Sequence, residues 1–406
     1  MNQKHKMTIT HLFTHALEIC ESFLRQPRIM AEKIYQKHKM TITHLFTYAL
    51  VICAYFACQS MIKAEKMTLS LEGQLVPICA YIVLAVSLNL TVGISGELSL
   101  GHAGFMYVGA ITGVIASMWM RYAFTEESAF FLFFENMNID FALVRMLISL
   151  IVAGVFAGIV GFIIGIPVLR LRGDYLAIVT LAFGEIIRNI MTCLYVAVNK
   201  KTGALNFTFN NSDIPSKDFK LFIKGPTGIT GNSPKIATFV IGIGLVLFTL
   251  LIVQNLINSR TGRAIKACRD NRIAAESMGL NVTKYKMIAF VTSACLAGMA
   301  GALYAANFSS VVPSKFSIDT SILILVFVVL GGLGNILGSV ISATVLTLLP
   351  ELLREFDDYR MLVYAVVLIL TMLITNSPIV KSLIGAIKEG AKKLFARKNT
   401  ENGANS

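Results

Sequence analysis

Long apolar segments separated by short polar connections dominate this sequence. A helix needs roughly 20 apolar residues to cross the hydrocarbon core of a bilayer, so the pattern predicts about ten transmembrane helices. The segments 318–330 and 336–350 are short and are joined by Gly331–Asn335, so it stays open whether they form two spans or one broken helix. We therefore predict an all-α, polytopic membrane protein. The predicted spans are 45–62, 74–94, 98–120, 143–168, 175–197, 236–257, 286–306, 318–330, 336–350 and 361–377.

Composition supports this prediction and excludes a soluble globular protein. Of the 406 residues, 55% are apolar and only 15% are charged, and the mean hydropathy is +0.69. The net charge of +13 is carried by loops and tails between the apolar spans. This distribution follows the positive-inside rule and predicts no nucleic-acid partner; the expected surroundings are membrane lipid.

The charge of the connecting segments predicts the orientation. The N-terminal region, the 169–174 turn, the 258–285 loop and the C-terminal tail are basic, whereas the 121–142 and 351–360 loops lean acidic. Ten spans with both termini in the cytoplasm place the basic segments inside and the acidic loops outside. The 198–235 loop then falls outside despite its lysines. Its Pro and Gly residues predict a folded external cap.

The N-terminus contains an internal repeat. Residues 3–20 recur at 36–53 with only two differences, and only the second copy continues into an apolar span. We predict a basic cytoplasmic extension over 1–44, a transmembrane domain over 45–378 and a basic cytoplasmic tail over 379–406. Whether residues 1–35 are a true extension or reflect an early start site stays open.

The charged stretch 262–279 is the most distinctive polar segment. Arg263, Lys266, Arg269 and Arg272 place it in the cytoplasm. Its Ala-rich core favours a helix that Gly262 and Gly279 are expected to break, and its basic face is expected to meet an acidic partner surface. From the residues alone, a solvated charged loop is the alternative.

Two further sites carry ionisable residues near apolar spans. The Gly-rich stretch 93–104 contains Gly96, Glu97 and His102, which indicate either a translocation path or close helix packing with both ionisable groups reaching cytoplasmic water. Glu185 and Arg188 are spaced to pair on one helix face, as a structural ion pair or as a polar lining of the path.

Catalytic and cofactor signatures are absent from the sequence. We find no hydrolase, zinc-protease or nucleotide-binding motif, and the Gly-rich stretch 330–339 lacks the Gly-Lys-Ser/Thr of a P-loop. Most of the seven cysteines lie in apolar runs without metal-like spacing. We therefore predict no catalytic residues, no metal and no cofactor, and a role in moving a solute across the membrane with energy supplied elsewhere.

Several long strings resemble the LivM-type permease of bacterial branched-chain amino acid ABC importers over about residues 45 to 378. This resemblance implies a permease domain in the bacterial cytoplasmic (inner) membrane, paired with a LivH-like permease. It also implies two cytoplasmic ABC ATPases that hydrolyse ATP and a periplasmic binding protein that delivers Leu, Ile or Val. The strings are RLRGDYLAIVTLAFGEIIR (170–188), GRAIKACRDNRIAAESMGLNVTKYKMIAF (262–290), LAGMAGALYA (296–305), VLGGLGNILGSVIS (329–342) and LTLLPELLREFDDYRMLVY (346–364).

The same resemblance gives the 262–279 segment a role as the loop that docks an ATPase. The family motif begins Glu-Ala-Ala, whereas Ile273 precedes the two alanines here. Three alternatives remain: a permease for urea or another small amide or amino acid, an ion-coupled transporter using Glu97, His102 or Glu185, and a scaffold or channel without coupling. The docking residues that the resemblance implies are Gly262, Arg263, Arg269, Arg272, Ala274, Ala275, Glu276 and Gly279.

Overall fold

The computed structural model describes most of the predicted membrane region. The chain divides into two units, Met1–Ala64 and Glu65–Ser406. In the first unit, the described part is an apolar helix at Phe46–Lys63, which confirms the first predicted span. The predicted span at 361–377 and the terminal extensions lie almost entirely outside the described residues, which are 46–64, 68–123, 141–171, 173–199, 204–210, 219–230, 236–353 and isolated positions between 362 and 369.

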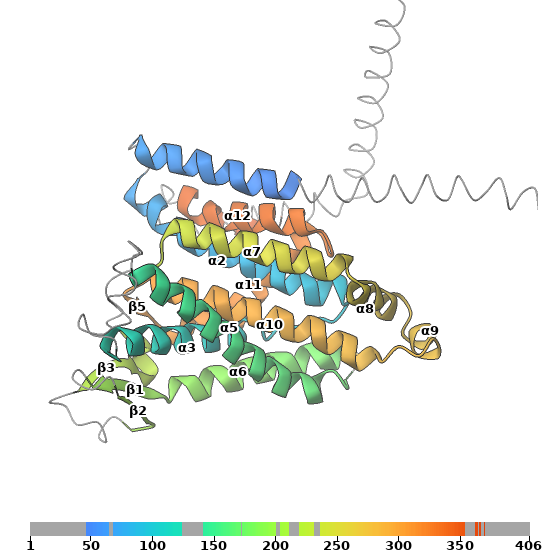
Figure 1. Ribbon diagram of the computed structural model, residues 1–406. Coiled ribbons are helices and arrows are strands. Elements are labelled where there is room, and N and C mark those ends of the chain that lie inside the picture. The colour runs from blue at the N-terminus through green and yellow to red at the C-terminus, as the bar shows by residue number, and fades with distance from the viewer. Residues whose placement is uncertain are drawn as a thin grey trace, which may run out of the picture. The chain divides into compact units, whose positions relative to one another are not determined.

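The second unit is a bundle of apolar helices (Figure 1). Across the described part of both units, seven helices are long and apolar enough to cross a membrane. This confirms the helical membrane architecture predicted from the hydropathy pattern. The six long helices of the second unit are α2 (Leu69–Asn89, continued by the π-helix η1, Leu90–Ile94), α3 (His102–Ala123), α5 (Phe141–Val168), α6 (Asp174–Thr192), α7 (Phe239–Asn258) and α10 (Val282–Asn307).

The two short predicted segments form a pair of antiparallel helices rather than one broken helix. They are α11 (Ile318–Gly331) and α12 (Ile336–Leu352). The Ser342 hydroxyl donates to the Phe327 carbonyl between them, and the backbones of Gly331 and Gly338 lie in direct contact. Gly332 and Gly334 in the connection have φ values of 90° and 83°, a region that favours glycine, so the sequence turns tightly there.

Helices α2, α3 and α10 form the centre of the bundle. The membrane-spanning part of α2 and η1 is almost entirely buried, whereas most residues of α6 are partly or fully exposed. Glycines let α3 and α10 approach closely: a Cβ atom at Gly109 would collide with the backbone of Gly298, and one at Gly301 with the backbone of Met106. Small residues therefore set the packing of the core.

A small antiparallel sheet adds to the helical architecture at one end of the bundle. Its strand order is β2-β1-β3-β4-β5. Strands β2, β3 and β4 lie in the 198–235 loop, where a folded external cap is predicted, whereas β1 begins just before the loop and β5 follows α10. The predicted span 175–197 ends early because its last residues pair as a strand. The strands are β1 (Tyr195–Asn199), β2 (Leu205–Thr208), β3 (Phe219–Lys224), β4 (Ile229–Thr230) and β5 (Ser310–Val311), with short 3-10 turns η3 (Gly225–Thr227) and η4 (Pro313–Phe316).

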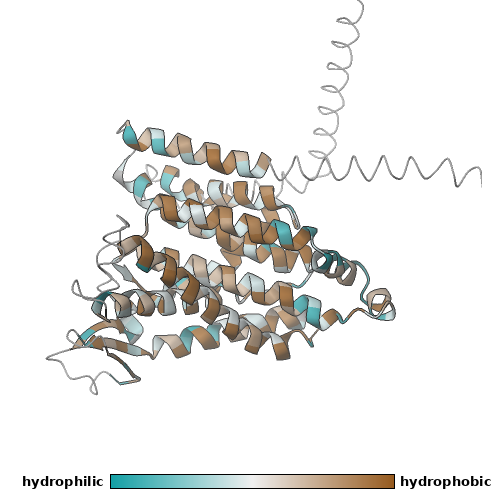
Figure 2. Cartoon of the chain, viewed as in Figure 1, coloured by the Kyte–Doolittle hydropathy of each residue, from teal (hydrophilic) through white to brown (hydrophobic). Residues whose placement is uncertain are grey.

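The opposite end of the bundle carries two short polar helices, α8 (Arg260–Asp270) and α9 (Arg272–Ser277). They connect α7 to α10, whose other ends lie at the end of the bundle that carries the sheet (Figure 1). Figure 2 shows hydrophilic residues concentrated on α8, in contrast to the apolar bundle. The predicted polar segment is thus a helical structure that lies beyond the apolar spans.

Candidate coupling site

Each helix of the α8–α9 segment begins with a side-chain cap. The Ser259 hydroxyl accepts from the Gly262 N–H at 3.1 Å, and the Asn271 Oδ1 accepts from the Ala274 N–H at 3.0 Å. Asn281 caps α10 in the same way, through a 3.1 Å bond from the Lys284 N–H. Ser and Asn are favoured at these positions because their side chains satisfy otherwise unpaired amides. These caps divide the segment into two defined helices.

The Ala-Ala-x-x-x-Gly pattern has a local structural explanation. Ala275 packs with Cys268 and Val282 in a small apolar cluster, against which Leu280 also packs. The Leu280 N–H donates to the Ala275 carbonyl at 3.0 Å, and the Gly279 N–H donates to the Glu276 carbonyl at 3.0 Å. With φ at 80° for Gly279, this is a Schellman motif that ends α9. The pattern therefore explains both the packing of α9 and the position at which it ends.

Gly262 has a different role from the one predicted. It lies in the first turn of α8 rather than breaking a helix. A Cβ atom at this position would collide with the carbonyls of Leu256 and Ile257 at the end of α7. Glycine is needed here because the backbone of α8 passes close to the end of α7. The prediction for Gly279 is confirmed, since α9 ends there.

Two large apolar side chains are exposed at the tip of the segment. Ile273 is 77% exposed and Met278 is 83% exposed. The Arg272 guanidinium pairs with the Glu276 carboxylate at 2.9 Å on the same helix, and Arg263 donates to the Asn258 carbonyl at 3.3 Å. Ile273 and Met278 thus give the segment an apolar surface beside paired charges. The basic face expected from the sequence is thus combined with an apolar tip.

Arg269 connects this segment to the membrane bundle. Its Nη1 donates to the Gly93 carbonyl, in the π-helix η1, at 2.7 Å. Gly96 follows η1 with φ at 75°, and a Cβ atom there would lie 2.6 Å from Cγ of Arg269. The guanidinium therefore satisfies a backbone carbonyl at the end of a span, while the glycine leaves room for the arginine stem. Arg269, one of the predicted docking residues, thus contacts the helix bundle.

Glu97 is held by α10 in the same region. Its carboxylate forms an ion pair with the Lys286 ammonium, and the two side chains are only 12% and 13% exposed. α10 thus covers most of the Glu97 side chain and supplies its counter-charge. The pair attaches the start of α10 to the loop that follows η1.

Asn89 joins the α11–α12 connection to the same π-helix. Its Oδ1 accepts from the Gly334 N–H at 2.8 Å, and its Nδ2 donates to the Ser339 hydroxyl at 2.9 Å. A side chain at Gly93 would collide with both Asn89 and Gly334. We call the set Asn89, Gly93, Glu97, Arg269 and Lys286 the π-helix junction, because through it η1 contacts α8, α10 and the α11–α12 connection.

His102 lies within the bundle rather than at the aqueous boundary. It is 2% exposed, and its Nε2 lies 2.8 Å from the Ser87 hydroxyl on α2. The Ser87 hydroxyl also lies within hydrogen-bond distance of the Leu84 carbonyl, at 2.9 Å. The expectation that His102 reaches water was therefore wrong. The contact joins the start of α3 to α2.

Glu185 and Arg188 form the predicted pair on α6. Arg188 Nη2 lies 2.6 Å from Glu185 Oε2, and Arg188 Nε lies 2.8 Å from the same atom. Both groups belong to α6 and take no part in the π-helix junction. The five predicted path residues thus fall into three places: Gly96 and Glu97 beside α8 and α10, His102 in the core, and the α6 pair.

The sequence reasoning missed Asn89, Lys286 and the caps at Ser259, Asn271 and Asn281. The caps could have been found, because Ser or Asn directly precedes each helix. Asn89 was detectable as a polar residue within an apolar run, but its partners were not. In the described part of the chain, no group of His, Cys, Asp or Glu residues is arranged to hold a metal ion.

Comparison with known proteins identifies the family. The family of branched-chain amino acid transport system permease components matches residues 70–372. LivM, the high-affinity branched-chain amino acid transport system permease protein, is 34% identical in Salmonella typhimurium and 33% identical in Escherichia coli K12, each over 308 residues. Both alignments cover 72% of this chain and 66% of the relative, so the chain spans just under two thirds of their length.

More distant relatives act on other solutes. The fructose import permease protein FruG of Bifidobacterium longum is 28% identical over 284 residues, covering 68% of this chain and 72% of the relative. Among solved structures, PsaBC from Streptococcus pneumoniae aligns at 13% identity with a TM-score of 0.37, covering 80% of this chain and 98% of that chain. The match over 70–372 includes the described bundle and the α8–α9 segment. This chain belongs to the branched-chain amino acid transport system permease family.

Proposed function

We infer that this chain is the membrane permease subunit of an ATP-driven importer for leucine, isoleucine and valine. It provides the path through the bacterial inner membrane and is not itself catalytic, since partner ATPases hydrolyse the nucleotide. Support comes from the family match over residues 70–372 and from the identity with the two LivM proteins. Both chain termini and the α8–α9 segment are assigned to the cytoplasm by the positive-inside rule.

The observation that carries this proposal is the construction of the α8–α9 segment. It presents Ile273 and Met278 outward while Arg269 reaches back to the Gly93 carbonyl. A partner that grips the apolar tip therefore acts on α8, and α8 is bonded to the end of a central span. This arrangement suits a subunit that receives mechanical work from an ATPase.

The implied assembly has four kinds of subunit. The chain pairs with a LivH-like permease, two ATPases bind at the α8–α9 end, and a periplasmic binding protein delivers the amino acid at the sheet end. The opposite placement of the sheet and α8–α9 in the bundle supports this division (Figure 1). In this assembly, the binding protein rather than the permease binds the amino acid first and with the higher affinity.

Reconstitution tests the proposal against its alternatives. The complete complex is placed in proteoliposomes with the binding protein outside, and uptake of radiolabelled leucine, isoleucine, valine, urea, ribose and fructose is measured. We expect uptake of the three branched-chain amino acids only when ATP is present on the ATPase side. Uptake driven by an ion gradient without ATP would establish a secondary transporter, and preference for a sugar or urea would overturn the substrate assignment.

A further inference from the structure

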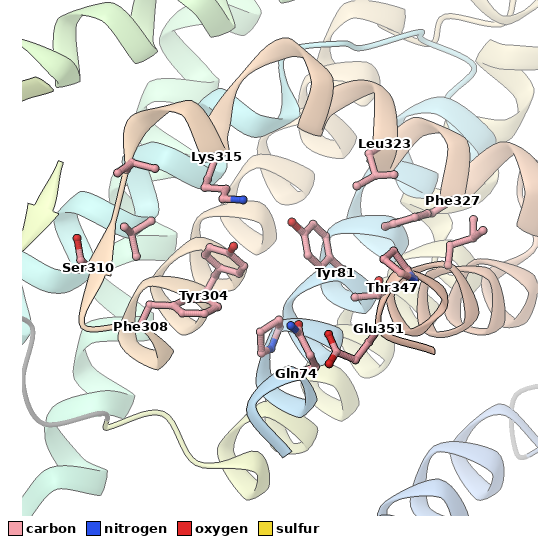
Figure 3. Close-up of a pocket in the computed structure, with 15 residues that line it drawn as sticks. Gln74, Tyr81, Tyr304, Phe308, Ser310, Lys315, Leu323, Phe327, Thr347 and Glu351 are labelled. Carbon is pink, nitrogen blue, oxygen red and sulfur yellow. The ribbon is translucent and has the colours of Figure 1, made fainter. Parts of the chain in front are cut away.

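A cavity of about 550 Å³ opens at the sheet end of the bundle. Its walls come from the start of α2, the ends of α10 and α12, the η4 turn and α11, as Figure 3 shows. The volume is within the range of small-molecule sites, which is roughly 300–1,000 Å³. The cavity is distant from the π-helix junction, since it lies at the other ends of the same helices.

Aromatic side chains form the apolar part of the cavity. The Tyr81 ring lies 6.0 Å from the Tyr304 ring and 5.9 Å from the Phe327 ring, both in edge-to-face arrangements. Edge-to-face packing holds the three rings in fixed positions against one another. They provide a preformed apolar surface for an aliphatic side chain, with the tyrosine hydroxyl groups at its margin.

Opposite charges lie on facing walls of this cavity. In Figure 3, Lys315 from η4 lies on one side and Glu351 from α12 on the other, with Tyr81 and Tyr304 between them. The structure shows no ion pair for the Lys315 ammonium within the part of the chain that it describes. Glu351 accepts a hydrogen bond from Ser70, and a carboxylate offers further acceptor positions. Gln74 lies beside Glu351 and adds an amide.

We propose that this cavity binds an α-amino acid with an apolar side chain in its zwitterionic form. The carboxylate is bound on the Lys315 side, the ammonium on the side of Glu351 and Gln74, and the side chain against Tyr81, Tyr304 and Phe327. The inference rests on the proposed function, because it makes the cavity the first position that a delivered amino acid occupies in the permease. A neutral sugar has no carboxylate for the Lys315 ammonium and no ammonium for the Glu351 carboxylate.

The test measures binding to the complex in lipid nanodiscs without the binding protein. Saturation-transfer NMR compares leucine with 3-methylbutylamine, which lacks the carboxylate, and with 4-methylpentanoate, which lacks the ammonium. We expect leucine to bind about tenfold or more tightly than either analogue, since each loses a charged hydrogen bond. Equal binding of all three compounds to the wild-type complex would overturn the proposal and requires no variant.

Variants assign the two charges. Lys315→Met should abolish the preference for leucine over 3-methylbutylamine, whereas Lys315→Arg should retain it. Glu351→Gln should abolish the preference for leucine over 4-methylpentanoate. Lys224→Met is the matched control, because Lys224 is an exposed lysine of the sheet outside the cavity. Wild-type leucine preference in Lys315→Met, or the same loss in Lys224→Met, would contradict the proposal.

Uptake in proteoliposomes separates the two inferences. If the wild-type complex imports leucine with ATP and the Lys315 and Glu351 variants import it with unchanged concentration dependence, the cavity assignment fails and the proposed function stands. If the wild-type complex imports no branched-chain amino acid, the proposed function fails. Half-saturating leucine concentrations raised about tenfold in Lys315→Met, with Lys224→Met unchanged, would support both.

Discussion

Replacing Arg269 with Met tests whether the α8–α9 segment works through the π-helix junction. The substitution keeps an apolar stem of similar length beside Gly96 but removes the donor to the Gly93 carbonyl. Ile273 and Met278 are left unchanged, so the exposed surface proposed to bind the ATPase is kept. We therefore expect an assembled complex in which ATP hydrolysis is poorly converted into uptake.

The magnitude follows from the contact. A hydrogen bond to a charged donor contributes about 1.5–3 kcal/mol, and the Arg269 side chain is 43% exposed, which places this bond at the lower end. A loss of about 1.5 kcal/mol corresponds to a factor of about ten in an equilibrium. The number of leucine molecules imported per ATP should therefore fall by about tenfold.

The assay measures leucine uptake and phosphate release in the same proteoliposomes. Lys266→Met is the matched control, because it removes a charge from the same helix at a position outside the predicted docking residues. Arg269→Lys keeps a charged donor on a shorter side chain, so it should restore coupling in part. Full coupling in Arg269→Met would refute the role of this bond.

Three further predictions concern the same segment. Gly279→Ala should destabilise the C-terminal end of α9 by about 1–2 kcal/mol, because φ is positive at this residue, and Gly279→Asn should destabilise it by less. Hydrogen–deuterium exchange of α9 measures both effects, and equal protection in the two variants would contradict the strain argument. Ile273→Glu and Met278→Glu should abolish co-purification of the ATPases, whereas Ser277→Glu, on an exposed polar position of α9, should retain it. Burial raises the pKa of the Cys268 thiol and so lowers its thiolate fraction at neutral pH. Maleimide labelling of Cys268 should therefore be slow at pH 7 and accelerate as the pH rises. Rapid labelling at pH 7 would show that the apolar cluster around Cys268 opens readily.

The helices of the bundle were predictable because the bilayer fixes their length and composition. The predicted spans 143–168 and 236–257 differ from α5 and α7 by at most three residues at either end. The prediction failed at the end of 175–197, which includes the first residues of the strand Tyr195–Asn199. These residues form a strand in the sheet, and a short apolar run does not distinguish a strand from a continuing helix.

The candidate site was predictable in its location but not in its contacts. Basic residues between two spans identified the α8–α9 segment, and the alanines indicated a helix. The partner of Arg269 lies 176 positions away in the sequence and the partner of Lys286 lies 189 positions away. Charge patterns indicate that an arginine is on a loop; only the packing of the bundle determines whether it turns outward to a partner or inward to a carbonyl.

The π-helix explains why these distant contacts meet at one place. A π-helical turn leaves backbone groups without their usual helical partners, and such turns are frequent at functional sites. Arg269 satisfies one of these carbonyls, at Gly93. The hydroxyls of Thr91, Ser95 and Ser99 are buried nearby without a hydrogen-bond partner among the residues that the structure describes. Arg269 and Gly93 thus connect α8 to the end of a central span through one backbone carbonyl, and Asn89 connects the α11–α12 turn to the same place.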